Sequence, residues 1–236
     1  MKNEIAVILF GPPGAGKTTQ AEHLKTTFRL AHIDSGRLIE RTVHDPAKQD
    51  DPVIARERSI FDSGVLNTPE WVAHLIAMEL RTVHETGHGV VFSGSPRTLY
   101  EAQVLTPVLE QLYGHDNIAF IKIAVSPETS LIRNTRRLVC KKCGKIYQGF
   151  AGAEPAGFCD CGGRLTTRIL DTAEAIKTRL DQYHNRTAPL FRFLMERGYA
   201  INETDGERGP DEIAKDLKNI VLRTLTINTR DNENQK

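Results

Sequence analysis

The first apolar segment of the chain covers residues 5–10 and is rich in β-branched side chains. A continuous run of this kind is typical of a strand that is buried on both faces of a parallel sheet. After a short glycine-rich turn the pattern changes, and apolar side chains recur at helical spacing at Ala21, Leu24 and Phe28. The sequence therefore predicts a buried strand, a turn and an amphipathic helix that begins near Thr18.

Later segments repeat this alternation of strand and helix patterns. Residues 88–94 and 118–125 are apolar candidates for strands, and a short third candidate lies around residues 199–201. Strands that alternate with helices form α/β folds, in which right-handed crossovers place helices on both faces of a parallel sheet. The predicted fold class is therefore α/β, with a parallel sheet as the middle of three layers.

Two stretches interrupt the alternation. Residues 34–70 show helical pieces separated by Pro46 and Pro52, and residues 138–170 are rich in glycine and cysteine with little periodicity. We interpret both as insertions at the mouth of the sheet, where loops carry function and are able to move. The polar end of the chain predicts a disordered tail. The expected division is a core of residues 1–33, 71–137 and 171–225, insertions at 34–70 and 138–170, and a tail at 226–236.

The charge of the chain limits its partners. Its 236 residues include 31 lysines and arginines and 30 aspartates and glutamates. It therefore lacks the basic excess typical of nonspecific binding to nucleic acid or to an anionic membrane. The first apolar run is too short for a signal-peptide core or a membrane span. We expect a single folding unit in the cytoplasm, with neither nucleic acid nor membrane as a partner.

A phosphate-binding motif follows the first predicted strand. Residues 11–18 read Gly-Pro-Pro-Gly-Ala-Gly-Lys-Thr and match Gly-x-x-x-x-Gly-Lys-Thr at every fixed position, so we expect a P-loop fold. The glycines let successive backbone amides curl inward, and the helix that follows adds its positive end. Lys17 is expected to bridge the β- and γ-phosphates of a nucleoside triphosphate, and Thr18 to ligate Mg²⁺. The residues expected to hold the triphosphate are Gly11, Gly14, Ala15, Gly16, Lys17 and Thr18.

The phosphate loop alone does not separate kinases from ATPases, GTPases and transport motors, but further motifs follow it. They are His-Ile-Asp-Ser-Gly at residues 32–36, Gly-Ser-Pro-Arg-Thr at 94–98, the cysteine-rich segment, and Tyr-His-Asn-Arg-Thr-Ala-Pro-Leu at 183–190. In order and spacing these motifs resemble the adenylate kinase family over about residues 5–206, in its long form with a zinc-bearing lid. The resemblance implies a monomer that transfers a phosphoryl group reversibly from ATP, with Mg²⁺, to a nucleoside monophosphate, with AMP as the leading candidate. It also implies that residues 34–70 bind the acceptor and that residues 138–170 form the lid.

The resemblance assigns roles to individual side chains. Phosphoryl transfer needs little covalent help, so catalysis is mostly positioning plus cations around the phosphoryl oxygens. Arg97 corresponds to the arginine that grips the monophosphate, and Ser35 stands where the family usually has threonine beside the acceptor. Thr19 and Arg133 extend the ATP side. The catalytic cations that the resemblance implies are Lys17, Arg97, Arg137, Arg168 and Arg179.

The acceptor side departs from the family pattern. Where the family has an aspartate and, three residues later, an arginine that binds the acceptor phosphate, this chain has Arg37 and Glu40. Positions 37 and 40 lie on one face of a helix. Arg37 therefore either pairs with Glu40 or takes over the phosphate, and Arg41 is a further candidate for that role.

Three more departures concern the metal, the base and the closing arginines. Ser93 replaces an aspartate that helps to hold Mg²⁺ through water, and Glu101 replaces a glutamine that reads the acceptor adenine. Leu170 replaces an aspartate, although Asp171 lies beside it. A carboxylate accepts hydrogen bonds but, unlike an amide, donates none. Three interpretations stay open: an adenylate kinase with compensated substitutions, a kinase of another nucleoside monophosphate, or a relative that binds ATP without catalysis.

The four cysteines lie in one short segment. Cys140 and Cys143 form a Cys-x-x-Cys turn, whereas Cys159 and Cys161 are one residue closer together than usual. Four thiolates with no histidine between them suit a closed, tetrahedral Zn²⁺ site. Such a site would stabilise a lid that has few apolar residues of its own. Free thiols, or a disulfide such as Cys140–Cys161, are the alternatives.

Overall fold

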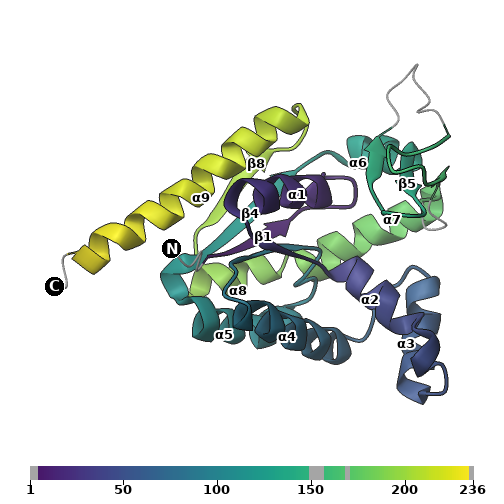
Figure 1. The fold of residues 1–236 in the computed structure, drawn as a ribbon, viewed down its shortest axis with the longest axis horizontal. Helices are drawn as coiled ribbons and strands as arrows, with labels where there is room; N and C mark the ends of the chain where they lie inside the picture. The colour runs from purple at the N-terminus through teal and green to yellow at the C-terminus, as the bar shows by residue number, and fades with distance from the viewer. Residues whose placement is uncertain (1–4, 149–156, 168–170, 234–236) are drawn as a thin grey trace.

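The computed structural model describes residues 5–148, 157–167 and 171–233. A parallel sheet with the strand order β2-β3-β1-β4-β8 forms its centre (Figure 1). Because every neighbouring pair is parallel, the carboxyl ends of these strands lie at one edge of the sheet. Open α/β sheets bind their ligands outside this edge. The strands are β1 (Ala6–Phe10), β2 (Ala31–Asp34), β3 (Val90–Ser93), β4 (Ile118–Ala124) and β8 (Ile201–Asp205).

Helices cover both faces of the sheet and give the predicted three layers. One face packs against α1 and α9, and the other against α4, α5 and α8 (Figure 1). Within the described ranges, no helix combines the length and apolarity that crossing a membrane requires. The helices are α1 (Lys17–Phe28), α2 (Ser35–Val43), α3 (Pro52–Asp62), α4 (Pro69–Glu85), α5 (Leu99–Tyr113), α6 (Pro127–Thr135), α7 (Ala173–Gln182), α8 (Leu190–Glu196) and α9 (Pro210–Glu233), with 3₁₀ turns at Pro46–Lys48 and His115–Asn117 and a π-helical turn at Tyr183–Thr187.

The central strand β1 accounts for the first apolar run. All of its residues are buried. Ile8 and Phe10 belong to the apolar cluster on the α4 and α5 side, whereas Val7 and Leu9 belong to the cluster on the α1 and α9 side. Because successive side chains of a strand point to opposite faces, a strand in the middle layer needs apolar side chains at every position. The predicted buried strand is confirmed.

Other strands agree with the sequence to different degrees. The candidates at 88–94 and 118–125 are confirmed as β3 and β4, and the last strand begins at Ile201 rather than at 199. The strand β2 was not predicted. It has only four residues, and the polar His32 and Asp34 alternate with apolar ones, so no apolar run marks it. The helix α9 continues to Glu233, so residues 226–233 form helical turns where the sequence predicts a disordered tail.

The two interruptions of the pattern have structures of their own. Residues 34–70 contain helical segments, as predicted, and Pro46 and Pro52 lie in first turns, where a missing N–H costs little. The glycine- and cysteine-rich stretch forms a small antiparallel sheet that the sequence did not predict. Its strands, in the order β6-β5-β7, are β5 (Arg137–Cys140), β6 (Ile146–Gln148) and β7 (Leu165–Thr166).

A buried carboxylate fixes the loop between α3 and α4. The side chain of Glu57 is fully buried and accepts hydrogen bonds from Asn67 Nδ2 at 3.0 Å, from the Thr68 backbone N at 3.0 Å and from Thr68 Oγ1 at 2.5 Å. Burial alone raises the pKa of Glu57, but these donors outweigh it and hold the pKa below its ordinary value of 4.5. The ionised side chain therefore ties α3 to the start of α4.

We expect Glu57→Gln to lower the free energy of unfolding by about 1–3 kcal/mol, because an amide cannot accept at both ends and leaves a buried donor unpaired. A carboxylate whose folded pKa is depressed contributes stability above its unfolded pKa, near 4.5, and loses it as the pH falls through the folded pKa. Urea unfolding at about pH 7 and about pH 3 should show a smaller difference from the parent at the lower pH. Glu85→Gln, at an exposed position in α4, is the control. Equal losses in both variants would contradict the role of Glu57.

Candidate active site

The phosphate loop joins β1 to α1 at the carboxyl edge of the sheet. Gly14 and Gly16 have φ angles of 76° and 88°, a conformation that glycine adopts without strain. A side chain at position 14 would also collide with Asn134, because the added Cβ would lie 2.5 Å from its Nδ2. The helix α1 begins at Lys17, directly after this turn, and presents its unpaired N–H groups there. The predicted motif therefore has the backbone of an anion-binding loop.

Lys17 lies at the centre of a group of cations. Its Nζ donates to two carbonyl oxygens of the phosphate loop, at 2.7 and 2.8 Å. Burial, the largest cause, and the nearby charges of Arg97, Arg179 and Arg137 together lower the pKa of Lys17 to about 7. Cations that are held close together repel one another, so the arrangement is suited to binding an anion.

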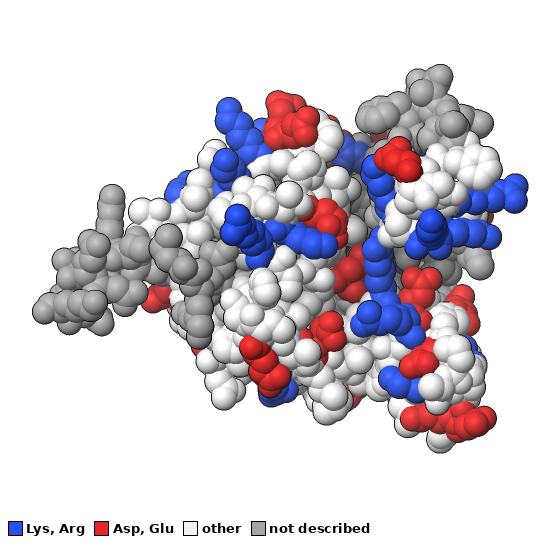
Figure 2. Space-filling model, viewed as in Figure 1, with Lys and Arg blue, Asp and Glu red and all other residues white. Residues whose placement is uncertain are grey.

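Two adjoining cavities meet at these cations. Both are lined by Lys17, Arg97 and Arg179. The first extends along α2 and α3 and has apolar walls that include Ile39 and Phe61. The second extends along the phosphate loop and α2 to the strands of the cysteine-rich stretch, and its walls include Thr18, Thr19 and Arg137. On the face drawn in Figure 2, lysine and arginine side chains gather where this stretch faces α2. The site therefore has room for two ligands that share one set of cations.

Asp171 holds two of the arginines in place. Nε of Arg137 donates to Oδ2 of Asp171 at 2.8 Å, and Nη2 of Arg137 donates to Oδ1. Nη1 of Arg179 lies 3.7 Å from the same Oδ1. Only 3% of the Asp171 side chain is exposed, so little water screens these contacts. Arg168 and Leu170, which the sequence analysis singled out, lie outside the described residues.

Further residues that the sequence predicts for the two nucleotide sites lie on α2 and α6. Arg133, on α6, donates from Nη1 to the Gly206 carbonyl oxygen at 2.8 Å. The described arginines of the catalytic set lie instead near Lys17. Ser35 is buried at the start of α2, and Glu40 and Arg41 line the second cavity.

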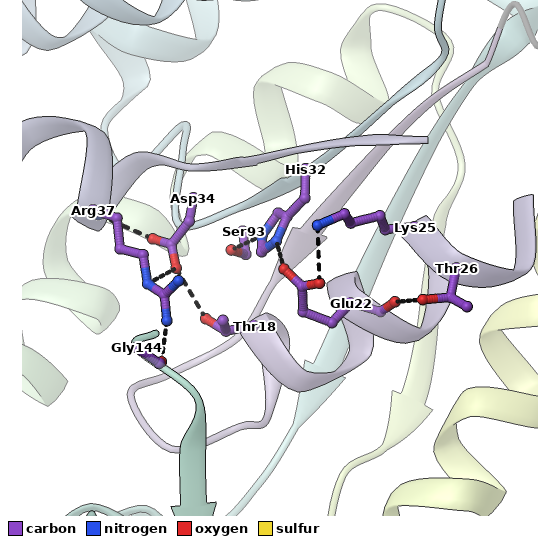
Figure 3. A network of polar contacts seen from close by, with 9 residues as sticks. All are labelled: Thr18, Glu22, Lys25, Thr26, His32, Asp34, Arg37, Ser93 and Gly144. Atoms are coloured by element: carbon purple, nitrogen blue, oxygen red, sulfur yellow. Dashed lines mark hydrogen bonds and ion pairs between the residues drawn. The ribbon is translucent and has the colours of Figure 1, made fainter. Parts of the chain in front are cut away.

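Arg37 connects α2 with the cysteine-rich stretch. Its Nε lies 3.8 Å from Oδ2 of Asp34, and its Nη2 donates to the carbonyl oxygen of Gly144 (Figure 3). A side chain at position 144 would collide with this guanidinium, since its Cβ would lie 2.6 Å from Nη2. Arg37 also lines the second cavity. The sequence analysis offered Glu40 as its partner, and the structure places Arg37 beside Asp34 and Gly144.

Glu101 lines the first cavity, and neighbouring residues donate hydrogen bonds to its carboxylate. Its Oε2 accepts hydrogen bonds from Ser95 Oγ and from the Arg97 backbone N, both at 2.9 Å. Its Oε1 accepts one from Thr98 Oγ1 at 3.1 Å. Burial raises the pKa of Glu101 against the opposing effect of these donors. Thr98 in turn caps α5 by accepting from the Glu101 backbone N at 3.2 Å, so the carboxylate is held at the start of this helix.

Oxygen ligands suited to Mg²⁺ lie beside Lys17. Thr18 Oγ1 is 3.5 Å from Asp34 Oδ2, and both residues line the second cavity (Figure 3). Hydroxyl and carboxylate oxygens are the ligands that Mg²⁺ prefers, with its other positions left to water and phosphate oxygens. The donor set therefore fits the Mg²⁺ that accompanies a nucleoside triphosphate.

The four cysteines converge although they come from two separate turns. Their sulfur atoms all lie within 4.8 Å of one another. Cys140 and Cys161 are 3.5 Å apart and Cys143 and Cys159 are 3.6 Å apart, sulfur to sulfur, and all four are free thiols. A disulfide bond of about 2.05 Å would bring the sulfurs much closer. Four sulfurs at about 2.3 Å from one tetrahedral ion are spaced by roughly 3.8 Å. The cluster can hold a metal ion.

The sequence did not predict the part that Asp34 and Asp171 have in the site. Asp34 was not singled out, because the strand that ends with it was not recognised. The bridging position of Asp171 depends on two distant arginines, which no local pattern reveals. One signal was available for Asp34, since it directly precedes the Ser-Gly pair that marks the acceptor side.

Comparison with known proteins agrees with this geometry. The sequence model of the family described as adenylate kinase matches residues 9–199. The chain is 34% identical to the adenylate kinase of Caldicellulosiruptor bescii over 223 residues, which cover 94% of this chain and 99% of that protein. Identity to the adenylate kinase of Pelobacter propionicus is 34% over 217 residues, 91% of this chain and 96% of that protein. Identity to the adenylate kinase of Bacillus pumilus is 32% over 217 residues, which cover 91% of this chain and 97% of that protein. This chain therefore belongs to the adenylate kinase family.

Proposed function

We propose that the protein transfers the γ-phosphoryl group of ATP reversibly to AMP. The observation that carries this proposal is the convergence of Lys17, Arg97, Arg137 and Arg179 where the two cavities meet. A phosphoryl group in transfer spreads negative charge over its equatorial oxygens, and fixed cations around that point stabilise it. The relatives reported above are named adenylate kinases, which supports AMP as the acceptor.

In this proposal each cavity holds one nucleotide. The ATP phosphates occupy the second cavity against the loop residues Gly11–Thr18 and Thr19, with Arg133 on the same side. AMP occupies the first cavity, where Arg97 binds its phosphate near Ser35. Arg37 and Arg41 line the adjoining second cavity and are further candidates to bind the acceptor phosphate. Asp171 keeps Arg137 and Arg179 oriented before either nucleotide arrives, which reduces the reorganisation needed in the transition state. Thr18 would hold the Mg²⁺ that enters with ATP, and the metal would supply positive charge against the polyphosphate.

We further propose that the segments 34–70 and 138–170 act as an acceptor-binding insertion and a lid. Both contribute walls to the second cavity, so closure over two nucleotides would exclude water, which otherwise competes as the phosphoryl acceptor. Arg168 belongs to this lid segment and completes the proposed set of cations. We propose that the protein acts in the cytoplasm as a monomer.

The acceptor base has one alternative with a specific observation in its favour. Glu101 offers carboxylate oxygens to the first cavity, and its Oε1 accepts a single hydrogen bond from Thr98. An oxygen that accepts only once has a lone pair left for an amino group of a base. Adenine, cytosine and guanine carry such an amino group and uracil does not. CMP and GMP are therefore the secondary acceptors to test.

ADP formation from ATP should be fastest with AMP and slowest with UMP among AMP, CMP, GMP and UMP, each assayed under the same conditions. Lys17→Ala should reduce kcat/KM with AMP by about 10²-fold or more, because a charge aimed at the transferred phosphoryl group is lost. Lys218→Ala, at an exposed position on α9, is the matched control and should leave kcat/KM unchanged. If the parent turned over none of the four acceptors while still binding ATP, the proposed activity would be wrong.

We propose that the cysteine cluster holds one structural Zn²⁺. Elemental analysis of purified protein should find about one zinc per chain, since four thiolates close a tetrahedral site. Cys143→Ser should lose most of that zinc and lower the midpoint of thermal unfolding, because binding of a structural metal contributes to folding. Lys141→Ser, in the same turn and also exposed, should keep both zinc and midpoint. A parent protein with reduced thiols and no zinc would refute the assignment.

A further inference from the structure

The carboxylate of Asp34 lies one strand away from the position where the family has one. The strands β2 and β3 are neighbours, and Asp34 and Ser93 are register partners at their carboxyl ends. The family pattern has an aspartate at position 93 that helps to hold Mg²⁺. In this chain the negative charge is absent at position 93 and present at the adjacent position 34. The same edge of the sheet therefore keeps one carboxylate, displaced sideways by one strand.

The two oxygens of Asp34 have different surroundings (Figure 3). Oδ1 accepts a hydrogen bond from the Arg37 backbone N at 3.2 Å and caps α2. Oδ2 lies 3.5 Å from the hydroxyl of Thr18, the residue placed to ligate Mg²⁺. The Asp34 side chain is 19% exposed and lines the same cavity as Lys17 and Thr18. One oxygen therefore serves the fold, and the other is directed at the metal-binding end of the phosphate loop.

Ser93 is engaged in another direction. Its Oγ lies 2.7 Å from Nε2 of His32, and Nδ1 of the same ring lies 2.7 Å from Oε1 of Glu22. Figure 3 shows this chain of three side chains running from β3 through β2 to α1, on the side of the network away from Arg37. A neutral hydroxyl held by a histidine offers no charge to a cation. Ser93 therefore does not replace the aspartate that the family has at this position.

Arg37 does not cancel the charge of Asp34. Its Nε is 3.8 Å from Oδ2, and 46% of the Arg37 side chain is exposed. Exposed ion pairs between neighbouring turns of a helix are worth only a few tenths of a kcal/mol. The same guanidinium also donates to the Gly144 carbonyl oxygen. The carboxylate therefore remains able to bind a divalent cation, whose electric field is far stronger than that of the Arg37 guanidinium.

We propose that Asp34 anchors the Mg²⁺ of the bound nucleotide beside Thr18, in place of the aspartate that the family has at position 93. Mg²⁺ is held in such sites by one or two carboxylates, with waters and substrate phosphates completing its shell. Asp34 is thus a metal-positioning residue. This inference rests on the proposed function, because the metal enters with ATP.

The test compares the Mg²⁺ affinity of the protein–ATP complex in parent and variants, measured by calorimetric titration of ATP at a series of Mg²⁺ concentrations without acceptor. Asparagine also caps helices well, so Asp34→Asn removes the charge and keeps α2. It should weaken Mg²⁺ affinity by about 10- to 100-fold and leave the affinity for metal-free ATP unchanged or higher. Asp51→Asn makes the same change at the N-cap of α3 and should alter neither affinity.

Two further variants test whether the carboxylate can be moved back to position 93. Asp34→Ser should show the same loss of Mg²⁺ affinity, and Asp34→Ser combined with Ser93→Asp should recover most of it by restoring the family arrangement. If Asp34→Asn and Asp34→Ser kept the parent affinity for Mg²⁺, the assignment would be wrong even though ATP binds. A parent that bound no ATP, with or without Mg²⁺, would instead overturn the proposed function itself.

Discussion

Mutual repulsion among the cations around Lys17 is the constraint to which the rest of the site is adapted. Bringing an ammonium group and three guanidinium groups together in a partly buried place is unfavourable until an anion arrives. Burial first, and then these neighbouring charges, lower the pKa of Lys17 to about 7. Asp171 offsets part of the repulsion by pairing with Arg137 and Arg179. The remaining positive charge is what a polyphosphate neutralises. In the proposed function, ATP binding and transition-state stabilisation thus have the same electrostatic origin.

The parallel sheet holds these charged groups close together in spite of their repulsion. The burial of β1 on both faces fixes the strand from which the phosphate loop departs, and the loop glycines turn the chain directly into α1. Because neighbouring strands end at the same edge, residues far apart in sequence, such as Asp34 and Ser93, become side-by-side neighbours. The apolar layers on each side hold this edge rigid, so charged groups are positioned by packing rather than by their own interactions.

The sequence predicted those parts of the molecule that depend on strong local signals. The continuous apolar run of β1 and the glycine–lysine–threonine turn each have one structural interpretation, and both were confirmed. The strand β2 could not be found in this way, because half of its residues are polar and serve the site instead of the core. Asp34 was missed for the same reason, and the bridging role of Asp171 depends on a contact between residues 34 positions apart. The small β5–β7 sheet escaped notice because backbone pairing and a cysteine cluster, rather than an apolar face, define it.

The contact between Arg37 and Gly144 joins two segments that are far apart in the sequence. One guanidinium at the start of α2 is bonded to a carbonyl oxygen 107 residues away, within the cysteine turn. That guanidinium also faces the cavity where nucleotide phosphates are expected. A phosphate that binds the Nη2 of Arg37 competes with the Gly144 carbonyl oxygen for that donor. The carbonyl oxygen of Gly144 and a nucleotide phosphate are therefore alternative acceptors for the same N–H group.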